Sequence, residues 1–89
     1  MPTVCFTAAL QRFLPVSSAR VEAATVAEAL AAVFAQQPVL RGYVLDDQGA
    51  LRRHVAAYVN GQPISDRRRL SDAVGPSDEI YVFQALTGG

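Results

Sequence analysis

Hydrophobic and polar residues alternate at the start of the chain. Residues 3–7 (TVCFT) carry apolar side chains at alternate positions, which predicts a half-buried β-strand. Residues 8–15 follow as a turn with two apolar anchors, Leu10 and Phe13. Residues 19–23 then predict a short second strand antiparallel to the first.

A helical period replaces the alternation at Val26. Thr25 and Glu28 have the spacing of a capping box, in which the Thr25 hydroxyl accepts from the Glu28 backbone N–H. Apolar residues recur at spacings of three and four up to about Gln37, so one face of this helix should pack against a sheet. Pro38 disfavours helical geometry for the residue before it, and the helix should end one or two residues earlier.

The next segment, residues 40–54, is less regular. Short extended pieces at 43–45 and 51–53 flank an Asp- and Gly-rich turn at 46–49, which suggests a hairpin-like excursion. No helix is expected in this segment.

The remaining residues predict strands separated by turns. Residues 55–59 alternate again, and Asn60-Gly61 after them is a strong signal for a tight turn. Ile64 begins a short edge piece, and the final strand is expected over residues 79–85.

One helix that crosses between two hairpins predicts an α+β fold, a mixed sheet of four to five strands with one main helix on one face. If the first and last strands pair in parallel at the centre, the sheet closes around the helix as in a β-grasp. No repeat or linker divides residues 1–85, so we expect a single domain followed by a flexible tail at 86–89.

The composition of the chain argues against several classes of function. The 89 residues are 51% hydrophobic and 18% charged, with no apolar run long enough for a membrane span and no secretion signal, which predicts a soluble cytoplasmic protein without membrane partners. The single cysteine, Cys5, excludes an internal disulfide. Eight basic and eight acidic residues balance, which argues against nucleic-acid binding. All eight basic residues are arginine, so no lysine amine could attack an activated carboxylate on the same chain.

The chain ends on Gly88-Gly89, directly after an apolar strand. Two glycines cannot fill a core, and fixing them costs more backbone entropy than fixing other residues. Without Cβ atoms they could enter a narrow channel in a partner enzyme, and the stretch from Leu86 spans roughly 13 Å when extended. The alternative is a plain disordered tail or an expression remnant.

Four segments in this order carry a resemblance: Val59-Asn60-Gly61, Leu70-Ser71-Asp72, Ser77-Asp78-Glu79-Ile80 and the ending Ala85-Leu86-Thr87-Gly88-Gly89. Together they resemble the ubiquitin-like sulfur carriers, a family that includes the small subunit of molybdopterin synthase, the thiamine-pathway carrier and the carrier of a cysteine synthase. The resemblance is strongest over the C-terminal segment. Phe83-Gln84-Ala85 departs from the family, which often has proline there, and the 40–54 excursion is longer than in the thiamine carriers and closer to the cysteine-synthase type.

The resemblance implies that the Gly89 carboxylate is adenylated by an E1-like partner enzyme, which uses ATP. Sulfide or a sulfurtransferase then converts it to a thiocarboxylate, which a downstream synthase consumes. The chain itself would be a carrier rather than an enzyme, with no tightly bound cofactor. It has no Walker-type phosphate loop, since Gly42, Gly49 and Gly61 are isolated.

Docking requires a surface as well as a tail. If Ile80 and Val82 face the helix, Tyr81 and Phe83 point away from it, on the side where Tyr58 also projects. These three aromatics, with Leu86 and Thr87 of the tail, form the predicted partner-binding site. The alternative is that the aromatics only form stabilising cross-strand pairs.

Other candidates have simpler interpretations. The arginines at 52–53 and 67–69 could meet an acidic partner or be merely solvated. Cys5 could form a thioester or disulfide with a partner or simply pack. His54 lacks further ligands at metal-binding spacing, and the acidic pairs at 46–47 and 78–79 are expected at turns.

Three hypotheses remain: a sulfur carrier, a protein modifier that forms isopeptide bonds through Gly89, and a non-reactive β-grasp subunit that binds a partner through its sheet. The sequence does not name the sulfur acceptor.

Overall fold

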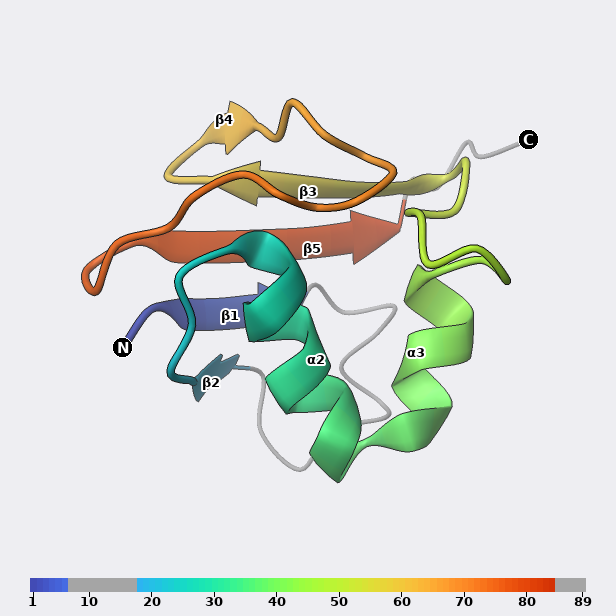
Figure 1. The fold of residues 1–89 in the computed structure, drawn as a ribbon, viewed down its shortest axis with the longest axis horizontal. Helices are drawn as coiled ribbons and strands as arrows, with labels where there is room; N and C mark the ends of the chain where they lie inside the picture. Colours follow the sequence, from blue (N-terminus) through green and yellow to red (C-terminus); the bar gives the residue numbers. More distant parts are fainter. Residues whose placement is uncertain (7–17, 85–89) are drawn as a thin grey trace.

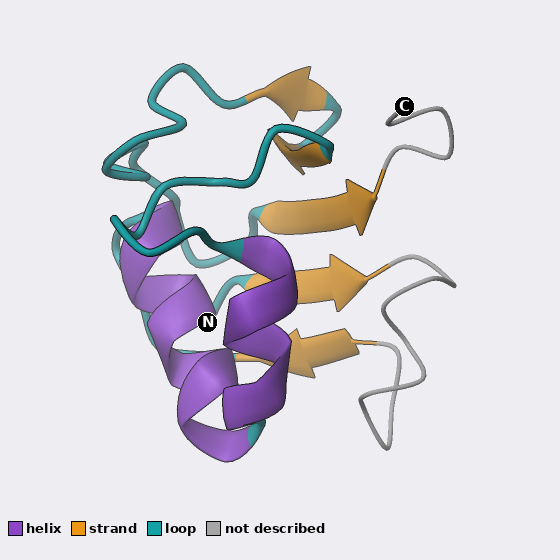
Figure 2. Ribbon diagram, turned by 90° about the vertical axis from the view of Figure 1, so that its right-hand side faces the viewer, coloured by secondary structure: helices purple, strands orange, loops and turns teal. Residues whose placement is uncertain are grey.

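The computed structural model describes residues 1–6 and 18–84, in which a five-stranded mixed sheet carries both helices on one face (Figures 1 and 2). The strands are β1 (Thr3–Phe6), β2 (Ser18–Arg20), β3 (Val55–Val59), β4 (Gln62–Pro63) and β5 (Glu79–Gln84), and the helices are α2 (Val26–Gln36) and α3 (Pro38–Val44). The strand order is β2-β1-β5-β3-β4. The α+β class and the β-grasp arrangement predicted from the sequence are confirmed.

The centre of the sheet is the parallel pair β1 and β5, as predicted. Val4 lies beside Ile80, and both side chains are fully buried against the helices. β3 pairs antiparallel with the other edge of β5, with Ala57 opposite Val82. β5 is thus hydrogen-bonded on both sides, which fixes the strand that leads into the C-terminal tail.

Helix α2 begins and ends as the sequence predicts. The Glu28 N–H donates to the Thr25 hydroxyl at 3.2 Å, while the Glu28 carboxylate accepts from the Ala24 N–H at 2.8 Å, one residue earlier than in a standard capping box. Its buried residues are Val26, Ala29, Leu30, Val33 and Phe34. This apolar face closes one side of the core.

The predicted irregular excursion over residues 40–54 was wrong at its start, because residues 38–44 form a second helix, α3. Pro38 ends α2 but also occupies the first turn of α3, where its fixed φ and missing N–H cost nothing. Leu40 and Val44, four residues apart, are fully buried. What remains of the predicted hairpin is a single antiparallel bridge between Leu45 and Leu51 around a turn.

Two short elements are displaced from their predicted positions. β2 covers residues 18–20 rather than 19–23. Val21, directly after it, is buried, and its N–H donates to the Pro2 carbonyl at 3.0 Å. The edge strand β4 comes before Ile64, which turns inward and is 9% exposed. The predicted anchors Leu10 and Phe13 lie outside the described residues.

Candidate functional site

The face of the sheet opposite the helices carries the predicted aromatic residues. Side chains alternate along β5, so fully buried Ile80 and Val82 face the core while Tyr81 and Phe83 lie on the open face. Tyr81 is 40% exposed, and Phe83 and Tyr58 are half-buried. We call Tyr58, Tyr81 and Phe83 the aromatic patch.

Strand register brings the aromatic patch together. Tyr58 of β3 is the direct neighbour of Tyr81, and its ring centroid lies 5.3 Å from that of Phe83 at an interplanar angle of 31°. On the other side of β5, Cys5 of β1 is the register partner of Tyr81. The aromatic residues therefore do form the cross-strand pairs of the alternative interpretation, yet much of the surface of Tyr81 remains exposed to solvent.

Two titratable groups in this row, Cys5 and Tyr81, have pKa values above their usual ranges. Burial, reinforced by the negative charge of Glu79, raises the pKa of the Cys5 thiol, against the opposing effect of a hydrogen bond with Tyr81. The Glu79 charge also raises the pKa of the Tyr81 hydroxyl. Because the thiolate is the nucleophilic form of cysteine, Cys5 is poorly suited to thioester or disulfide chemistry here.

A hydrogen-bond network holds the start of β5. Asn60, at φ 51°, donates through Nδ2 to Asp78 Oδ1 at 2.8 Å and accepts from the Glu79 N–H at 2.9 Å. The other Asp78 oxygen accepts from the Gly75 N–H at 2.7 Å, and these two contacts lower the pKa of Asp78. The Asn-Gly turn and the Asp-Glu pair are separate turn signals in the sequence. In the structure they are joined by hydrogen bonds at the start of β5.

The first arginine of the 67–69 run has a structural partner that the sequence did not reveal. Arg67 Nη2 donates to the backbone carbonyl oxygens of Arg52 at 2.9 Å and Val55 at 2.7 Å. The Arg67 carbonyl in turn accepts from the Leu51 N–H at 2.9 Å. The loop between β4 and β5 is thereby fastened to the start of β3, and Arg67 is not merely solvated.

The predicted tail residues Leu86, Thr87, Gly88 and Gly89 lie outside the described residues. β5 is described up to Gln84, which pairs with Val55 one position beyond Phe83. The tail therefore continues directly from the aromatic patch.

Residues 1–6 and 18–84 offer neither a metal centre nor a membrane-spanning helix. His54 is not part of any group of three or more metal-ligating side chains among these residues. Nor does any helix in that part of the chain have the length and apolar character needed to cross a bilayer.

Comparison with known proteins decides the family. The sequence model described as the ThiS family matches residues 5–89, nearly the whole chain. The chain belongs to the ThiS family. In sequence it is also similar to small archaeal modifier protein 1 of Haloferax volcanii, with 33% identity over 66 residues that cover 74% of this chain and 71% of that protein.

Solved structures of several small proteins have the same ubiquitin-like β-grasp fold as this chain. The crystal structure of the Haloferax volcanii modifier superposes with a TM-score of 0.84 at 28% identity, covering 99% of this chain and 98% of that chain. CysO in the Amycolatopsis orientalis BexX/CysO complex gives 0.87 at 22% identity, with both chains fully covered. Mycobacterium tuberculosis CysO gives 0.83 at 20%, covering 97% and 100%. These superpositions show that the chain has the ubiquitin-like β-grasp fold.

Proposed function

We propose that this protein is a sulfur carrier whose reactive group is the carboxylate of Gly89. The observation that supports this most directly is that the family match extends through the two terminal glycines. Glycines without Cβ atoms suit passage through a narrow enzyme channel and contribute nothing to a core.

The chemistry requires activation because a carboxylate is anionic and its oxygen leaves poorly. An E1-like enzyme would couple the Gly89 carboxylate to AMP from ATP, with release of pyrophosphate. Sulfide then attacks the carbonyl carbon and displaces AMP, leaving a thiocarboxylate. An enzyme persulfide would instead displace AMP to form an acyl disulfide, from which a second thiol of that enzyme releases the thiocarboxylate as the two enzyme sulfurs join in a disulfide. The thiocarboxylate sulfur is a better nucleophile than the oxygen it replaced, and a downstream synthase would transfer it to its substrate.

The aromatic patch is proposed as the docking surface for the activating enzyme. It presents three aromatic rings on the open face of the sheet, and it adjoins the strand end from which the chain continues into the tail. Exposed aromatic clusters are favoured at protein interfaces, where they supply contact area with little loss of side-chain entropy. The CysO relative was crystallised in a complex with BexX, so partner binding by a carrier of this fold has a precedent.

A cysteine-type or molybdopterin-type pathway is proposed for the sulfur. The chain would act as a carrier rather than a catalyst, in the cytoplasm, where reducing conditions preserve a thiocarboxylate. The ATP requirement would belong to the activating partner, and this chain needs no cofactor of its own.

A second function, protein modification through an isopeptide bond to Gly89, is favoured by the similarity to an archaeal protein named as a modifier. Both functions use the same activated carboxylate. They differ in whether the attacking group is sulfur or a lysine amine on another protein.

Intact-mass measurement of the chain, isolated from cells that contain its partner enzymes, distinguishes these functions. Replacement of one terminal oxygen by sulfur supports the carrier, and higher-mass conjugates support the modifier. Deletion of Gly89 should abolish both products. Unmodified protein from such cells, with no effect of the deletion, would instead indicate a non-reactive binding subunit.

A further inference from the structure

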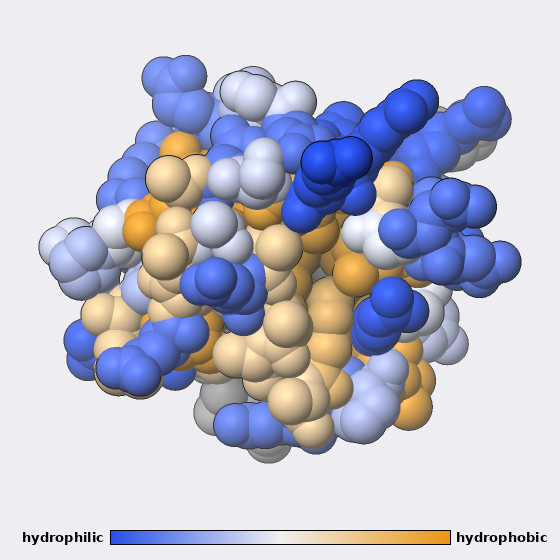
Figure 3. Space-filling model, viewed as in Figure 1, coloured by the Kyte–Doolittle hydropathy of each residue, from blue (hydrophilic) through white to orange (hydrophobic). Residues whose placement is uncertain are grey.

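The helical side of the molecule, opposite the aromatic patch, contains a groove of about 400 Å³. It lies between α2, α3 and the loop that precedes β5. Its apolar lining includes Ala27, Ala31, Ala35, Phe34, Leu45 and Leu70. Figure 3 shows this side, with an apolar band over α2 bordered by strongly hydrophilic atoms. The volume is within the usual range of ligand sites.

Small side chains on α2 create the groove. Ala27, Ala31 and Ala35 are spaced by four residues, so they lie along one side of the helix, next to its buried face. Ala31 and Ala35 are exposed, while Phe34 and Leu70 beneath them are buried. A partner side chain placed here would contact an apolar floor that the protein already holds in place.

Arginines border the groove on two sides. Arg41 of α3 and Arg69 of the loop both line it, and Arg68 and Arg69 line an adjoining hollow of about 460 Å³. Asp46 also lines that second hollow, but its carboxylate accepts from the backbone N–H groups of Gln48 and Ala50. Within the described residues, the guanidinium groups of these three arginines have no acidic partner at ion-pair distance.

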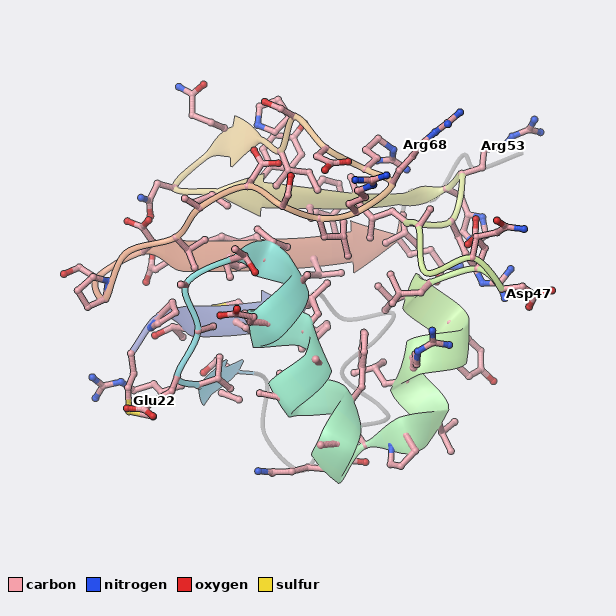
Figure 4. All side chains as sticks on the ribbon, in the orientation of Figure 1. Glu22, Asp47, Arg53 and Arg68 are labelled. Atoms are coloured by element: carbon pink, nitrogen blue, oxygen red, sulfur yellow. The ribbon has the colours of Figure 1, made fainter. Side chains whose placement is uncertain are left out.

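The loop that carries Arg68 and Arg69 is held rigidly. The Asp66 carboxylate accepts from both of their backbone N–H groups, at 3.1 and 2.9 Å, and from the Ser71 hydroxyl. Asp72 accepts from the N–H groups of Ser65 and Asp66, each at 2.9 Å. Figure 4 shows Arg68 projecting outward from this loop. The arginine backbones are thus positioned before any partner arrives, which lowers the entropy lost on binding.

Leu70 on the groove floor has an unusual backbone conformation, with φ 57°. Leucine rarely adopts a positive φ, and such strain persists only where the surroundings impose it. Here the Leu70 N–H donates to the Asp66 carbonyl at 3.0 Å, and its carbonyl accepts from the Ala27 N–H at 2.8 Å. The strained residue therefore joins the arginine loop to α2 at the groove.

We propose that this groove binds an acidic segment of a partner protein that inserts one or two large apolar side chains. The apolar floor selects the inserted side chains, and Arg41 of α3 and Arg69 of the loop select carboxylates that flank them. The balanced overall charge and apolar floor favour a protein segment over a nucleic acid. Since the groove and the aromatic patch lie on opposite sides of the molecule, both can be occupied together.

The test is an NMR titration of the isotope-labelled chain with a short acetylated peptide that carries a Leu and Phe pair at helical spacing, flanked by Glu. Backbone signals of Ala31, Arg41 and Gly49 should shift, while those of Tyr58 and Tyr81 should not. Ala31→Glu places a carboxylate in the groove at an exposed helical position and should weaken binding at least roughly tenfold. The double variant Arg41→Glu with Arg69→Glu should do the same.

The matched control is Arg20→Glu, the same charge reversal at an exposed site on β2, which does not line the groove. It should leave peptide binding unchanged, and a peptide with Lys in place of Glu should not bind. Absence of shifts at millimolar peptide, shifts centred on the aromatic patch, or equal weakening by Arg20→Glu would overturn the proposal. Thiocarboxylate formation on the Ala31→Glu variant is a separate readout, because loss of groove binding leaves the chemistry of Gly89 intact.

Discussion

Replacing Tyr81 with aspartate places a charge at the centre of the aromatic patch. Tyr81 is 40% exposed and contributes a cross-strand contact with Tyr58. Such contacts stabilise a sheet by about 0.2–1 kcal/mol, against about 5–15 kcal/mol for unfolding a domain. Tyr81→Asp should therefore remain folded, although Glu79 on the same face adds some repulsion.

The effect on docking should be larger. An aromatic side chain at the centre of an interface commonly contributes about 2 kcal/mol, or roughly thirtyfold in affinity. Loading of Tyr81→Asp by the activating enzyme, followed as pyrophosphate release at subsaturating carrier, should fall by about that factor. Phe83→Asp should behave similarly, although loss of its ring contact with Tyr58 costs about 0.5–1.5 kcal/mol of stability.

Ala31→Glu, a charge on the opposite side of the molecule, is the matched control for loading. Unchanged loading of a folded Tyr81→Asp variant would refute the role of the aromatic patch. So would equal losses for Tyr81→Asp and Ala31→Glu, since one of these residues lies on the patch and the other does not.

Three further predictions concern stability and conjugation. Leu30→Ala, at a fully buried site, should cost about 2–5 kcal/mol and lower Tm by roughly 10 °C or more in a thermal melt, whereas an unchanged Tm would contradict the assigned core. Arg67→Ala should lower the urea midpoint because the Arg52 and Val55 carbonyl oxygens lose their donor. Arg68→Ala should leave the midpoint unchanged, because the Arg68 side chain makes no such contact among the described residues. If the chain modifies proteins, mass spectrometry should find single copies on each site and no chains of copies, because it has no lysine.

Acid should destabilise the loops around β5. The Ser71 hydroxyl and the Arg69 N–H lower the pKa of Asp66 from 3.8 to about 2, and backbone N–H donors lower the pKa values of Asp72 and Asp78. A lowered folded-state pKa gives stability that is complete above the unfolded value and is lost as pH falls through the folded value. Urea midpoints should thus decline between about pH 4 and pH 2, and Asp66→Asn should flatten that decline. An equal decline in the variant would contradict the assignment.

Local patterns predicted the elements that local physics determines. The Thr25 cap, the apolar period of α2 and the Asn60-Gly61 turn depend on neighbouring residues, and each is present in the structure. α3 was missed because Pro38 was interpreted only as a helix end, although proline also favours a first turn. The signal for α3 in the sequence was the pair of apolar residues Leu40 and Val44, which are four positions apart and are both fully buried in the structure.

Tertiary roles were not predictable in the same way. The partners of Arg67 are carbonyl oxygens of residues far away in the sequence, and no spacing rule connects them. The groove likewise depends on where the loop carrying Arg69 lies relative to the alanines of α2. In the sequence these alanines indicate only a helix. The terminal glycines stand out because they have no packing role, the family resemblance supplies their chemistry, and their reactivity stays a prediction.

Transfer of sulfur requires the tail to leave one active site and enter another. If the activating enzyme and the synthase both bind the aromatic patch, they compete, and the carrier must dissociate between steps. A patch of three aromatics, two of them half-buried, suits such an exchange because a small contact area permits fast release. A partner in the arginine-bordered groove would not compete with either enzyme. Saturating Glu-rich peptide should therefore leave the Kd for the activating enzyme unchanged, and mutual exclusion of the two ligands would contradict the independence of the two faces.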